Sequence, residues 1–399
     1  MEIKQAVILA GGRGQRLAPF TDTNPKPMIP IHGKPFLEHL ILLLKENDIK
    51  EVVILTGYLG EKIQEYFKDG SEFGVKITYS HTPFKNERGE ENESGLRLKN
   101  AEHLLNDTFL LMYCDNYWPL QVKKLEEFYS GGGADILTTV YSNKDTSTNN
   151  NVLVDKHGYV VKYDRSRQAK DLNGVDVGFF IINKKVINIL PNYNSHFERD
   201  LLPALVLQKK VLGYLTDHKY YSISDLQRAQ TVGKFLEPQK VIFLDRDGVI
   251  NKKPPKADYI KTWEEFEFLP GVIEAIKKLT GSGYDIYLIT NQPGIARGIM
   301  QKKDLDQIHQ NMQEELGKNG AKIKAIYACL HNWDDGCECR KPQPGLLFQA
   351  ARENHLDLTK SIFIGDDPRD QLAGQAAGCK TILVNPEVGL VEALKHLSG

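Results

Sequence analysis

Residues 240–251 read KVIFLDRDGVIN, and this stretch decides how the second half of the chain folds. Four apolar residues, 241–244, lead directly into Asp245, and Asp247 and Gly248 follow. An apolar run of this length predicts a buried strand, so both carboxylates should lie at the carboxyl end of a sheet, where open α/β folds place their chemistry. One acid can then attack phosphorus and bind Mg²⁺ while the other transfers a proton. A plain strand-end turn is the alternative.

Three later stretches favour the catalytic interpretation. Thr290 ends the apolar run YDIYLIT, Lys341 lies in CRKPQPG before a predicted helix, and Asp366 follows IFIG. With Asp245, they resemble the four motifs of the haloacid dehalogenase phosphatase superfamily. The resemblance implies a Rossmann-like fold over 240–399. It also implies that Asp245 is the nucleophile and Asp247 the acid–base group. Thr290 and Lys341 would contact the phosphoryl group. Asp245, Asp247 and Asp366 would bind Mg²⁺.

The chain leaves little room for a cap over this site. Between Asp247 and the next predicted strand there is space only for a loop and a helix that begins near Pro270. We therefore expect a minimal cap and an open site suited to a small phosphorylated metabolite. The run TNQPGIARG, 290–298, resembles the branch that contains histidinol-phosphate and heptose-bisphosphate phosphatases. That resemblance implies substrate contacts from Asn291 and Arg297.

Three of the five cysteines lie close together in YACLHNWDDGCECRKP. Cys329, His331, Cys337 and Cys339 form the ligand set of a closed four-coordinate zinc site. Reduced, unrelated thiols are the alternative, because these spacings are tighter than in common zinc fingers. Heptose-bisphosphate phosphatases have a similar loop, and the resemblance implies a structural Zn²⁺ that orders the segment carrying Arg340 and Lys341 into the phosphate site.

The first half of the chain opens with a predicted strand, 5–10, that runs into LAGGRGQRLAPFTDTNPKPMIP. Glycines bring backbone N–H groups close to a phosphate, and Lys26 is stiffened by a proline on each side. The run resembles the signature of sugar-1-phosphate nucleotidyltransferases, and the resemblance extends to about residue 236. It implies nucleotide binding by Gly11, Gly12, Arg13, Gly14 and Lys26. Arg16 and Lys26 would neutralise charge as pyrophosphate leaves.

Further residues follow from the same resemblance. Asp115 ends the apolar run FLLMYCD and would bind the catalytic Mg²⁺, while Asp176 and Gly178 lie in the expected sugar-contacting strand. Many relatives carry a second metal-binding aspartate where this chain has Ser222. Either Asp225, three residues on, replaces it or one carboxylate suffices. The stretch SGLRLKNA, 94–101, is similar to the cytidylyltransferase branch and leaves the base open.

Composition excludes several classes of protein. The net charge is −1 and the basic residues are spread along the chain, so we expect no nucleic-acid partner. The early apolar run AVILA is too short for a signal peptide or a membrane span, and five cysteines are too few for a disulfide scaffold. We expect a cytoplasmic protein without a membrane partner; the oligomeric state stays open.

These patterns predict two α/β domains, 1–236 and 240–399, joined by a short linker. The two resemblances together imply a bifunctional enzyme of nucleotide-activated heptose synthesis. The second domain would remove the 7-phosphate of D-glycero-D-manno-heptose 1,7-bisphosphate. The first would join the 1-phosphate to a nucleoside triphosphate, GTP by preference and CTP as second choice. Two alternatives stay open: a mannose or glucose nucleotidyltransferase joined to a histidinol-phosphate-like phosphatase, and a nucleotide-sensing first domain that regulates the phosphatase.

Overall fold

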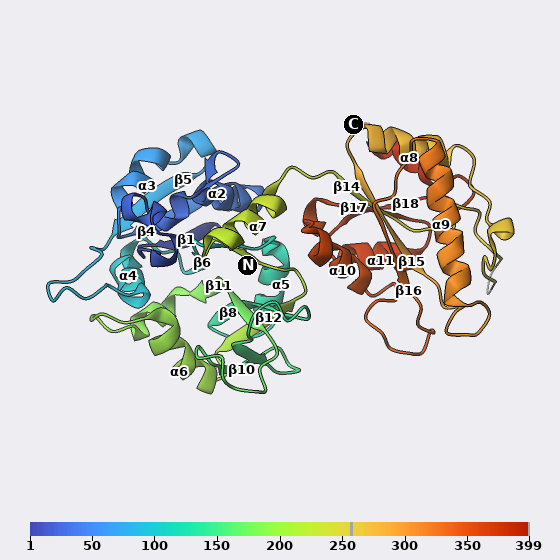
Figure 1. Cartoon of the computed structure of the whole chain (residues 1–399). Helices are drawn as coiled ribbons and strands as arrows, with labels where there is room; N and C mark the ends of the chain where they lie inside the picture. The colour runs from blue at the N-terminus through green and yellow to red at the C-terminus, as the bar shows by residue number, and fades with distance from the viewer. Residues whose placement is uncertain (256–257, 398–399) are drawn as a thin grey trace. The chain divides into compact units, whose positions relative to one another are not determined.

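The computed structural model describes residues 1–255 and 258–397 (Figure 1). Its chain divides into two compact units, Met1–Leu236 and Glu237–Gly399. Each unit is built on its own largely or fully parallel sheet, so the predicted α/β fold class is confirmed. Within the described residues, no helix combines the length and the apolar character that a membrane crossing would require.

The first unit contains a seven-stranded sheet in the order β12-β8-β11-β6-β1-β4-β5. Neighbouring strands are parallel except for β11, which runs antiparallel to both β6 and β8. The strands are β1 (Gln5–Ala10), β4 (Glu51–Thr56), β5 (Lys76–His81), β6 (Thr108–Tyr113), β8 (Ile136–Tyr141), β11 (Val175–Asn183) and β12 (Val211–Thr216). Three two-stranded ladders add β2 (Pro30–Ile31) with β3 (Lys34–Pro35), β7 (Asn116–Tyr117) with β13 (Tyr221–Ser222), and β9 (Val152–Val154) with β10 (Val160–Tyr163).

Helices cover both faces of this sheet. Alternate residues of β1 point to opposite sides, so Ile8 packs in one core and Val7 in the other. The Ile8 side is covered by α2 (Phe36–Glu46), α3 (Gly60–Phe67), α5 (Val122–Ser130) and α7 (Leu226–Leu236), and the Val7 side by α4 (Ser94–Asn100) and α6 (Leu202–Leu207). A short α1 (Phe20–Thr23) follows the glycine loop. A π-helical turn, Phe197–Leu201, runs directly into α6.

The second unit has a fully parallel five-stranded sheet in the order β16-β15-β14-β17-β18. Its strands are β14 (Val241–Leu244), β15 (Asp285–Asn291), β16 (Ala325–Cys329), β17 (Ile362–Gly365) and β18 (Lys380–Leu383). In β14 the side chain of Phe243 faces one core and that of Leu244 the other. Burial on both faces explains why its sequence is a continuous apolar run rather than an alternating one.

Five helices complete the second unit. They are α8 (Val272–Gly281), α9 (Lys302–Lys318), α10 (Gly345–Asn354), α11 (Pro368–Ala376) and α12 (Leu390–Leu397). The cores place α8, α9 and α12 on one face of the sheet and α10 and α11 on the other, as Figure 1 shows for α9 and α10. The helix expected near Pro270 begins at Val272, and only loops, bridges and a short 3₁₀ turn separate β14 from it in the described part of this segment.

Two candidate active sites

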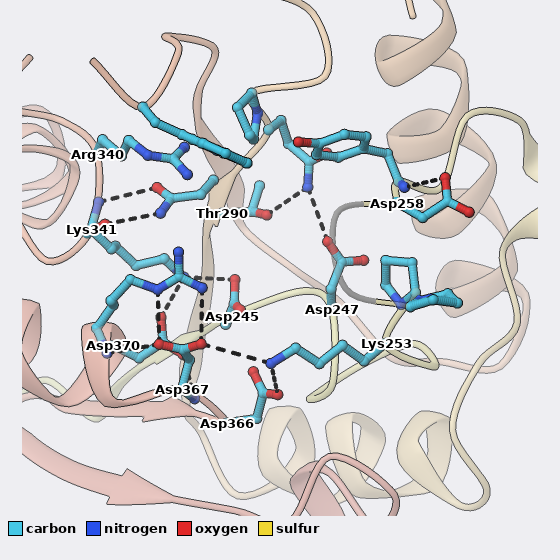
Figure 2. Close-up of a pocket in the computed structure, with 18 residues that line it drawn as sticks. Asp245, Asp247, Lys253, Asp258, Thr290, Arg340, Lys341, Asp366, Asp367 and Asp370 are labelled. Atoms are coloured by element: carbon cyan, nitrogen blue, oxygen red, sulfur yellow. Dashed lines mark hydrogen bonds and ion pairs between the residues drawn. The ribbon is translucent and has the colours of Figure 1, made fainter. Parts of the chain in front are cut away.

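The first candidate site lies at the carboxyl edge of the five-stranded sheet. Strands β14, β15 and β17 are parallel neighbours, so the residues at their carboxyl ends converge. Asp245, Thr290 and Asp366 therefore line one cavity of about 500 Å³, together with Lys341 and Asp247 (Figure 2). The structure brings together all five residues that the phosphatase motifs singled out.

Lys341 is the central cation of this cavity. Its ammonium lies 2.7 Å from Asp245 Oδ1 and 2.6 Å from Asp370 Oδ1, and it donates a hydrogen bond to the carbonyl of Ile289. The side chain is only 3% exposed. Burial alone would lower the pKa of Lys341, but the two carboxylates raise it, so the lysine is held as a cation.

Asp245 is buried beside that cation. Burial raises the pKa of Asp245 to about 7, Lys341 opposes the rise, and the nearby carboxylates of Asp370 and Asp247 add to it. A desolvated carboxylate is a better nucleophile than a hydrated one, provided that a cation keeps it ionised. The arrangement therefore suits attack on an electrophilic phosphorus.

The Asp247 carboxylate is fixed by donors from three directions. The fully buried Arg246 contacts it from Nε and from Nη2 at 3.1 Å, Asn251 donates at 2.9 Å, and Gln292 donates at 3.2 Å. Gln292 also donates to the Thr290 hydroxyl. Sequence reasoning missed Arg246, Asn251 and Gln292, although the first lies inside the DxDG stretch, the second follows it closely and the third lies in the TNQ motif. These donors hold the Asp247 carboxylate in one orientation, as the predicted proton transfer would require.

The cavity also fits a divalent cation. The carboxylate oxygens of Asp245, Asp366 and Asp370 all lie within 4.8 Å of one another. Asp366 Oδ1 is buried without a hydrogen-bond partner, and a Cβ on Gly248, whose φ is 87°, would lie 2.4 Å from Asp366 Oδ2. An orphaned carboxylate oxygen in a cluster of carboxylates is a donor set that Mg²⁺ prefers.

Asp370 and Lys253 also belong to this cluster, and neither was predicted to lie beside the Mg²⁺ site or to bind the metal. Asp370 is the third residue of α11, where it forms a capping box with Asp367 and pairs with Lys341. Lys253 reaches across from the loop after β14 and lies 2.6 Å from Asp366 Oδ2 (Figure 2). Burial raises the pKa of Asp366, and Lys253 opposes the rise. The carboxylate of Asp247 lies outside the three-carboxylate group, so its role as a metal ligand stays a prediction.

The other residues predicted to contact the substrate lie at different places in the structure. Arg340 lines the cavity, and its Nη1 is buried without a hydrogen-bond partner. Asn291 lines it too, but its amide exchanges hydrogen bonds of 3.1 Å with the backbone of Lys341, so it holds that lysine in place. Arg297 stacks instead over Trp333 and Tyr259 at the rim.

The four predicted zinc ligands converge at the end of β16. The Sγ atom of Cys339 lies 3.1 Å from that of Cys329 and 3.6 Å from that of Cys337, and His331 Nδ1 lies 3.1 Å from the same sulfur. Ligands at the corners of a tetrahedron with zinc–sulfur bonds would be separated by about 3.8 Å. The three cysteines of the cluster form no disulfide, so their arrangement with His331 fits a four-coordinate metal.

The second candidate site is a cavity of about 400 Å³ in the first unit. It is lined by Arg16, Asp115 and Asp176, three of the residues predicted for nucleotidyl transfer. Asp176 accepts hydrogen bonds from Thr138 and Tyr163 at 3.0 and 2.7 Å. Burial, with the charge of Glu198, raises the pKa of Asp176 to about 7. The cavity is thus lined both by β11, which carries Asp176, and by the segment after β6, which carries Asp115.

Lys26 is linked to this second site by an ion pair with Asp115. Its ammonium lies 2.5 Å from Asp115 Oδ2. Gly14 has a φ of 69°, and a Cβ there would lie 2.8 Å from Lys26 Cβ, so this turn needs glycine both for its conformation and for the passage of the lysine. The glycine loop and Lys26 are thus packed together, as a phosphate-binding loop requires.

A buried arginine supports the glycine loop from behind. Arg97 is 4% exposed and donates to the carbonyls of Thr56, Thr82 and Asn92. Burial lowers the pKa of Arg97 to about 10. A Cβ at Gly11 would lie 2.4 Å from its guanidinium, so Gly11 is glycine because Arg97 passes beneath it. Gly12 and Arg13 face outward, and Arg13 stacks over Tyr58.

Ser222, where the family resemblance implies a second aspartate, lies in the same cavity as Asp115. It pairs with Asn116 in the β7–β13 ladder and lines the cavity. Asp225 instead accepts a hydrogen bond from the backbone N–H of Arg228 at 2.8 Å, which caps α7. Its carboxylate lies 3.6 Å from the Arg228 guanidinium. This geometry favours the single-carboxylate alternative over replacement by Asp225.

Two arginines that sequence reasoning missed also line this cavity. Arg167 comes from the loop after β10 and Arg228 from the first turn of α7. None of the described carboxylates lies within ion-pairing distance of Arg16 or Arg167, and Arg167 is held by donation to the carbonyl of Asn149 at 2.6 Å. No local sequence signal marks them, because they converge only through the fold. The cavity is therefore rich in cations that a polyanion could bind.

Comparisons with known proteins match each half of the chain to a different family. The family model described as nucleotidyl transferase matches residues 5–226, and the model described as HAD-hydrolase-like matches residues 338–398. The first match covers more than half of the chain. In fold, the chain is similar to the crystal structure of a putative glucose-1-phosphate thymidylyltransferase from Bacillus anthracis, with 19% identity and a TM-score of 0.51 over 59% of this chain and 97% of that one.

Curated relatives match over a shorter stretch. D-glycero-beta-D-manno-heptose-1,7-bisphosphate 7-phosphatase of Helicobacter pylori is 43% identical over 150 residues, which is 37% of this chain and 85% of that protein. The D-glycero-alpha-D-manno-heptose-1,7-bisphosphate 7-phosphatase of Campylobacter jejuni is 44% identical over 151 residues, 37% of this chain and 84% of that protein. These relatives are named for opposite anomers, so the similarity leaves the anomer open.

Proposed function

The chain belongs to the nucleotidyl transferase family over residues 5–226 and to the family of heptose-1,7-bisphosphate 7-phosphatases over its other part, and from this premise we propose two successive reactions. The chain is an enzyme with a nucleotidyltransferase part and a phosphomonoesterase part. The second unit removes the 7-phosphate of D-glycero-D-manno-heptose 1,7-bisphosphate. The first unit then joins the heptose 1-phosphate to a nucleotide, GTP by preference and CTP as second choice, and releases pyrophosphate.

The observation that supports this proposal best is the charge arrangement of the phosphatase cavity. Asp245 is buried against Lys341, whose positive charge favours the ionised form of a nucleophilic carboxylate that burial would otherwise protonate. Arg340 offers its Nη1 atom, which is buried without a hydrogen-bond partner, in the same cavity. A substrate with two phosphate groups needs a cation for each, and this cavity supplies them.

The hydrolysis would proceed in two steps on the chain's own residues. Asp245 forms a bond to phosphorus as the bond from phosphorus to the sugar oxygen breaks, and Asp247 gives that oxygen its proton. Asp247 then takes a proton from water, whose oxygen attacks the phosphorus and frees Asp245 and inorganic phosphate. Lys341 and Thr290 hold the phosphoryl oxygens. Mg²⁺, held by Asp245, Asp366 and Asp370, would neutralise charge on the phosphoryl group.

The transfer needs no covalent bond to the protein. An oxygen of the sugar phosphate attacks the α-phosphorus as the bond to pyrophosphate breaks, so the protein contributes position and charge neutralisation. Arg16 and Lys26 are placed beside Asp115 for this purpose. We propose that Arg167 and Arg228 bind the phosphate of the acceptor, because two polyanions must meet in one cavity. A single Mg²⁺ held by Asp115 would neutralise charge on the triphosphate.

We propose that the Cys329 cluster binds one structural Zn²⁺ per chain. Three thiols and one imidazole within 4.8 Å of one another leave no coordination position for a reacting water. The segment from Cys339 runs directly into Arg340 and Lys341, so a metal here would fix the approach of both cations to the cavity.

One screen tests the proposed function. Purified protein is given heptose 1,7-bisphosphate, histidinol phosphate, and the 1-phosphates of heptose, mannose and glucose in both anomers, each with GTP, CTP, ATP or UTP. Phosphate release from the heptose bisphosphate and pyrophosphate release with heptose 1-phosphate and GTP are the expected results. Phosphate release from histidinol phosphate alone, or pyrophosphate release with glucose 1-phosphate alone, would contradict the assignment.

The same screen addresses a second candidate function. Ser222, in the same cavity as Asp115, stands where the family resemblance implies a second carboxylate, which favours a first unit that binds nucleotide without transferring it. That candidate predicts no pyrophosphate with any sugar phosphate and a phosphatase rate that changes when GTP or CTP is added.

A further inference from the structure

Trp333 is an exposed aromatic residue on the loop between His331 and Cys337. It is 54% exposed, whereas Trp118 is fully buried and Trp263 packs against the core of the second unit. Burying a tryptophan is strongly favourable, so an exposed one beside a cavity calls for an explanation. Trp333 lines the phosphatase cavity and also the neighbouring hollow, of about 680 Å³, formed by the cysteine loop.

The indole of Trp333 is held in place from one side. The Arg297 guanidinium carbon lies 4.6 Å from its ring centroid and 5.8 Å from that of Tyr259. Arg297 also donates a hydrogen bond of 2.8 Å to the Tyr259 hydroxyl. The stack ties together three loops: the loop after β14, the loop after β15 and the cysteine loop. Such a stack fixes the orientation of an exposed ring before any ligand arrives.

Only part of the cavity lining suits the carbon skeleton of a substrate. Its lining is dominated by aspartates, lysines and arginines, which suit phosphate groups. Apolar surface comes from three prolines and from the rings of Tyr259 and Trp333. Binding sites combine a few placed polar groups with such apolar walls, and an aromatic ring offers its face to the C–H groups of a ligand.

We propose that Trp333 stacks on the carbon skeleton of the sugar bisphosphate and selects it over smaller phosphate esters, an inference that rests on the proposed phosphatase activity. The ring would replace part of the cap that this unit lacks between β14 and α8. Arg297 then acts through Trp333 and not by binding phosphate. Because the ring is carried between two proposed zinc ligands, the metal loop contributes directly to substrate selection.

Tryptophan emission tests this directly. In an Asp245→Asn background, which cannot turn over, heptose 1,7-bisphosphate should change the emission, and adding Trp333→Phe should abolish most of that change. Trp263→Phe is the matched control, because that ring stacks on Phe266 in the core and should leave the ligand-induced change in place. An equal emission change with and without Trp333→Phe would overturn the proposal.

A kinetic comparison gives a second measure. Trp333→Ala should lower the ratio of kcat/KM for heptose bisphosphate to kcat/KM for glycerol phosphate by roughly tenfold, the loss common for a contact residue of this kind. Trp333→Phe should restore most of the ratio. An unchanged ratio in Trp333→Ala would contradict the proposal.

Failure of the proposed substrate is separable from failure of this inference. If the wild type released no phosphate from heptose bisphosphate, the proposed function would be wrong. The emission titration with fructose 1,6-bisphosphate and with inorganic phosphate would still decide the role of Trp333. A change with the sugar bisphosphate and none with phosphate supports the inference, and equal responses overturn it.

Discussion

The two candidate sites handle charge in opposite ways. In the second unit, Lys341, whose side chain is 3% exposed, is paired with two carboxylates of the cavity, Asp245 and Asp370. In the first unit, one carboxylate, Asp115, is paired with Lys26, and the remaining charged lining includes three arginines. The difference matches the chemistry: a covalent reaction needs a buried, ionised nucleophile, whereas bringing two polyanions together needs exposed cations.

The largest effect should come from removing the buried cation. Lys341→Met would leave Asp245 and Asp370 without their shared partner, so Asp245 would be protonated in part and the phosphoryl oxygens would lose a cation. We expect kcat for phosphate release to fall by roughly 10³-fold. Pyrophosphate release from heptose 1-phosphate and GTP serves as the control and should persist. Comparable loss of both activities would mean that the two sites are not independent.

Asp115, the carboxylate that pairs with Lys26, should be the next most sensitive position. Asp115→Asn should lower the rate of pyrophosphate release by roughly 10²-fold or more, because the residue is expected to hold the metal and also pairs with Lys26. Ser222→Asp sharpens the comparison by restoring the second carboxylate. A lower Mg²⁺ concentration for half-maximal rate is expected in that variant. Near-full activity of Asp115→Asn together with loss in Asp225→Asn would reverse the metal assignment.

Loss of the cysteine cluster should affect the second unit more than the first. Cys337→Ser should release the metal and lower the Tm of the phosphatase transition by roughly 5–10 °C, since structural zinc stabilises the fold that binds it. Metal analysis and scanning calorimetry measure both effects, and EDTA treatment of the wild type should reproduce them. A wild-type protein prepared without chelator that contained no zinc would contradict the assignment.

The smallest effect should be a change in how the stability of the first unit depends on pH. Burial raises the pKa of Asp176 from 3.8 to about 7, so between these values the folded unit holds a proton that the unfolded chain releases. Stability must then fall as the pH rises across this range. Asp176→Asn should flatten the decline in Tm between pH 5 and pH 7.5. Asp171→Asn, at an exposed carboxylate, is the control, and equal slopes in both variants would contradict the buried state of Asp176.

Site residues that lie at the ends of strands could be predicted from the sequence. Site residues that reach the cavity from loops and helices were harder to predict. Asp245, Thr290 and Asp366 could be placed together because parallel strands end at one edge of a sheet. Asp370 lies about one helical turn further, in a helix cap, and its pairing with Lys341 was not predicted. Lys253 pairs with Asp366 across 113 residues.

The same limit applies to the first unit. Asp115 follows a strand and was predicted, whereas Arg167 and Arg228 meet in the cavity from a loop and a helix that no motif connects. The SGLRLKNA stretch left the base open, and the sequence did not predict that the side chain of its Arg97 lies beneath the glycine loop. Long-range packing of this kind has no local signature in sequence.

Product analysis of two variants with two substrates tests the central claim that one chain carries two independent sites used in order. Asp245→Asn should form no nucleotide-heptose from the 1,7-bisphosphate but should form it normally from heptose 1-phosphate. Lys26→Ala should form none from either substrate and should convert the bisphosphate to accumulated heptose 1-phosphate. Efficient nucleotidyl transfer by Asp245→Asn directly onto the bisphosphate would contradict the account.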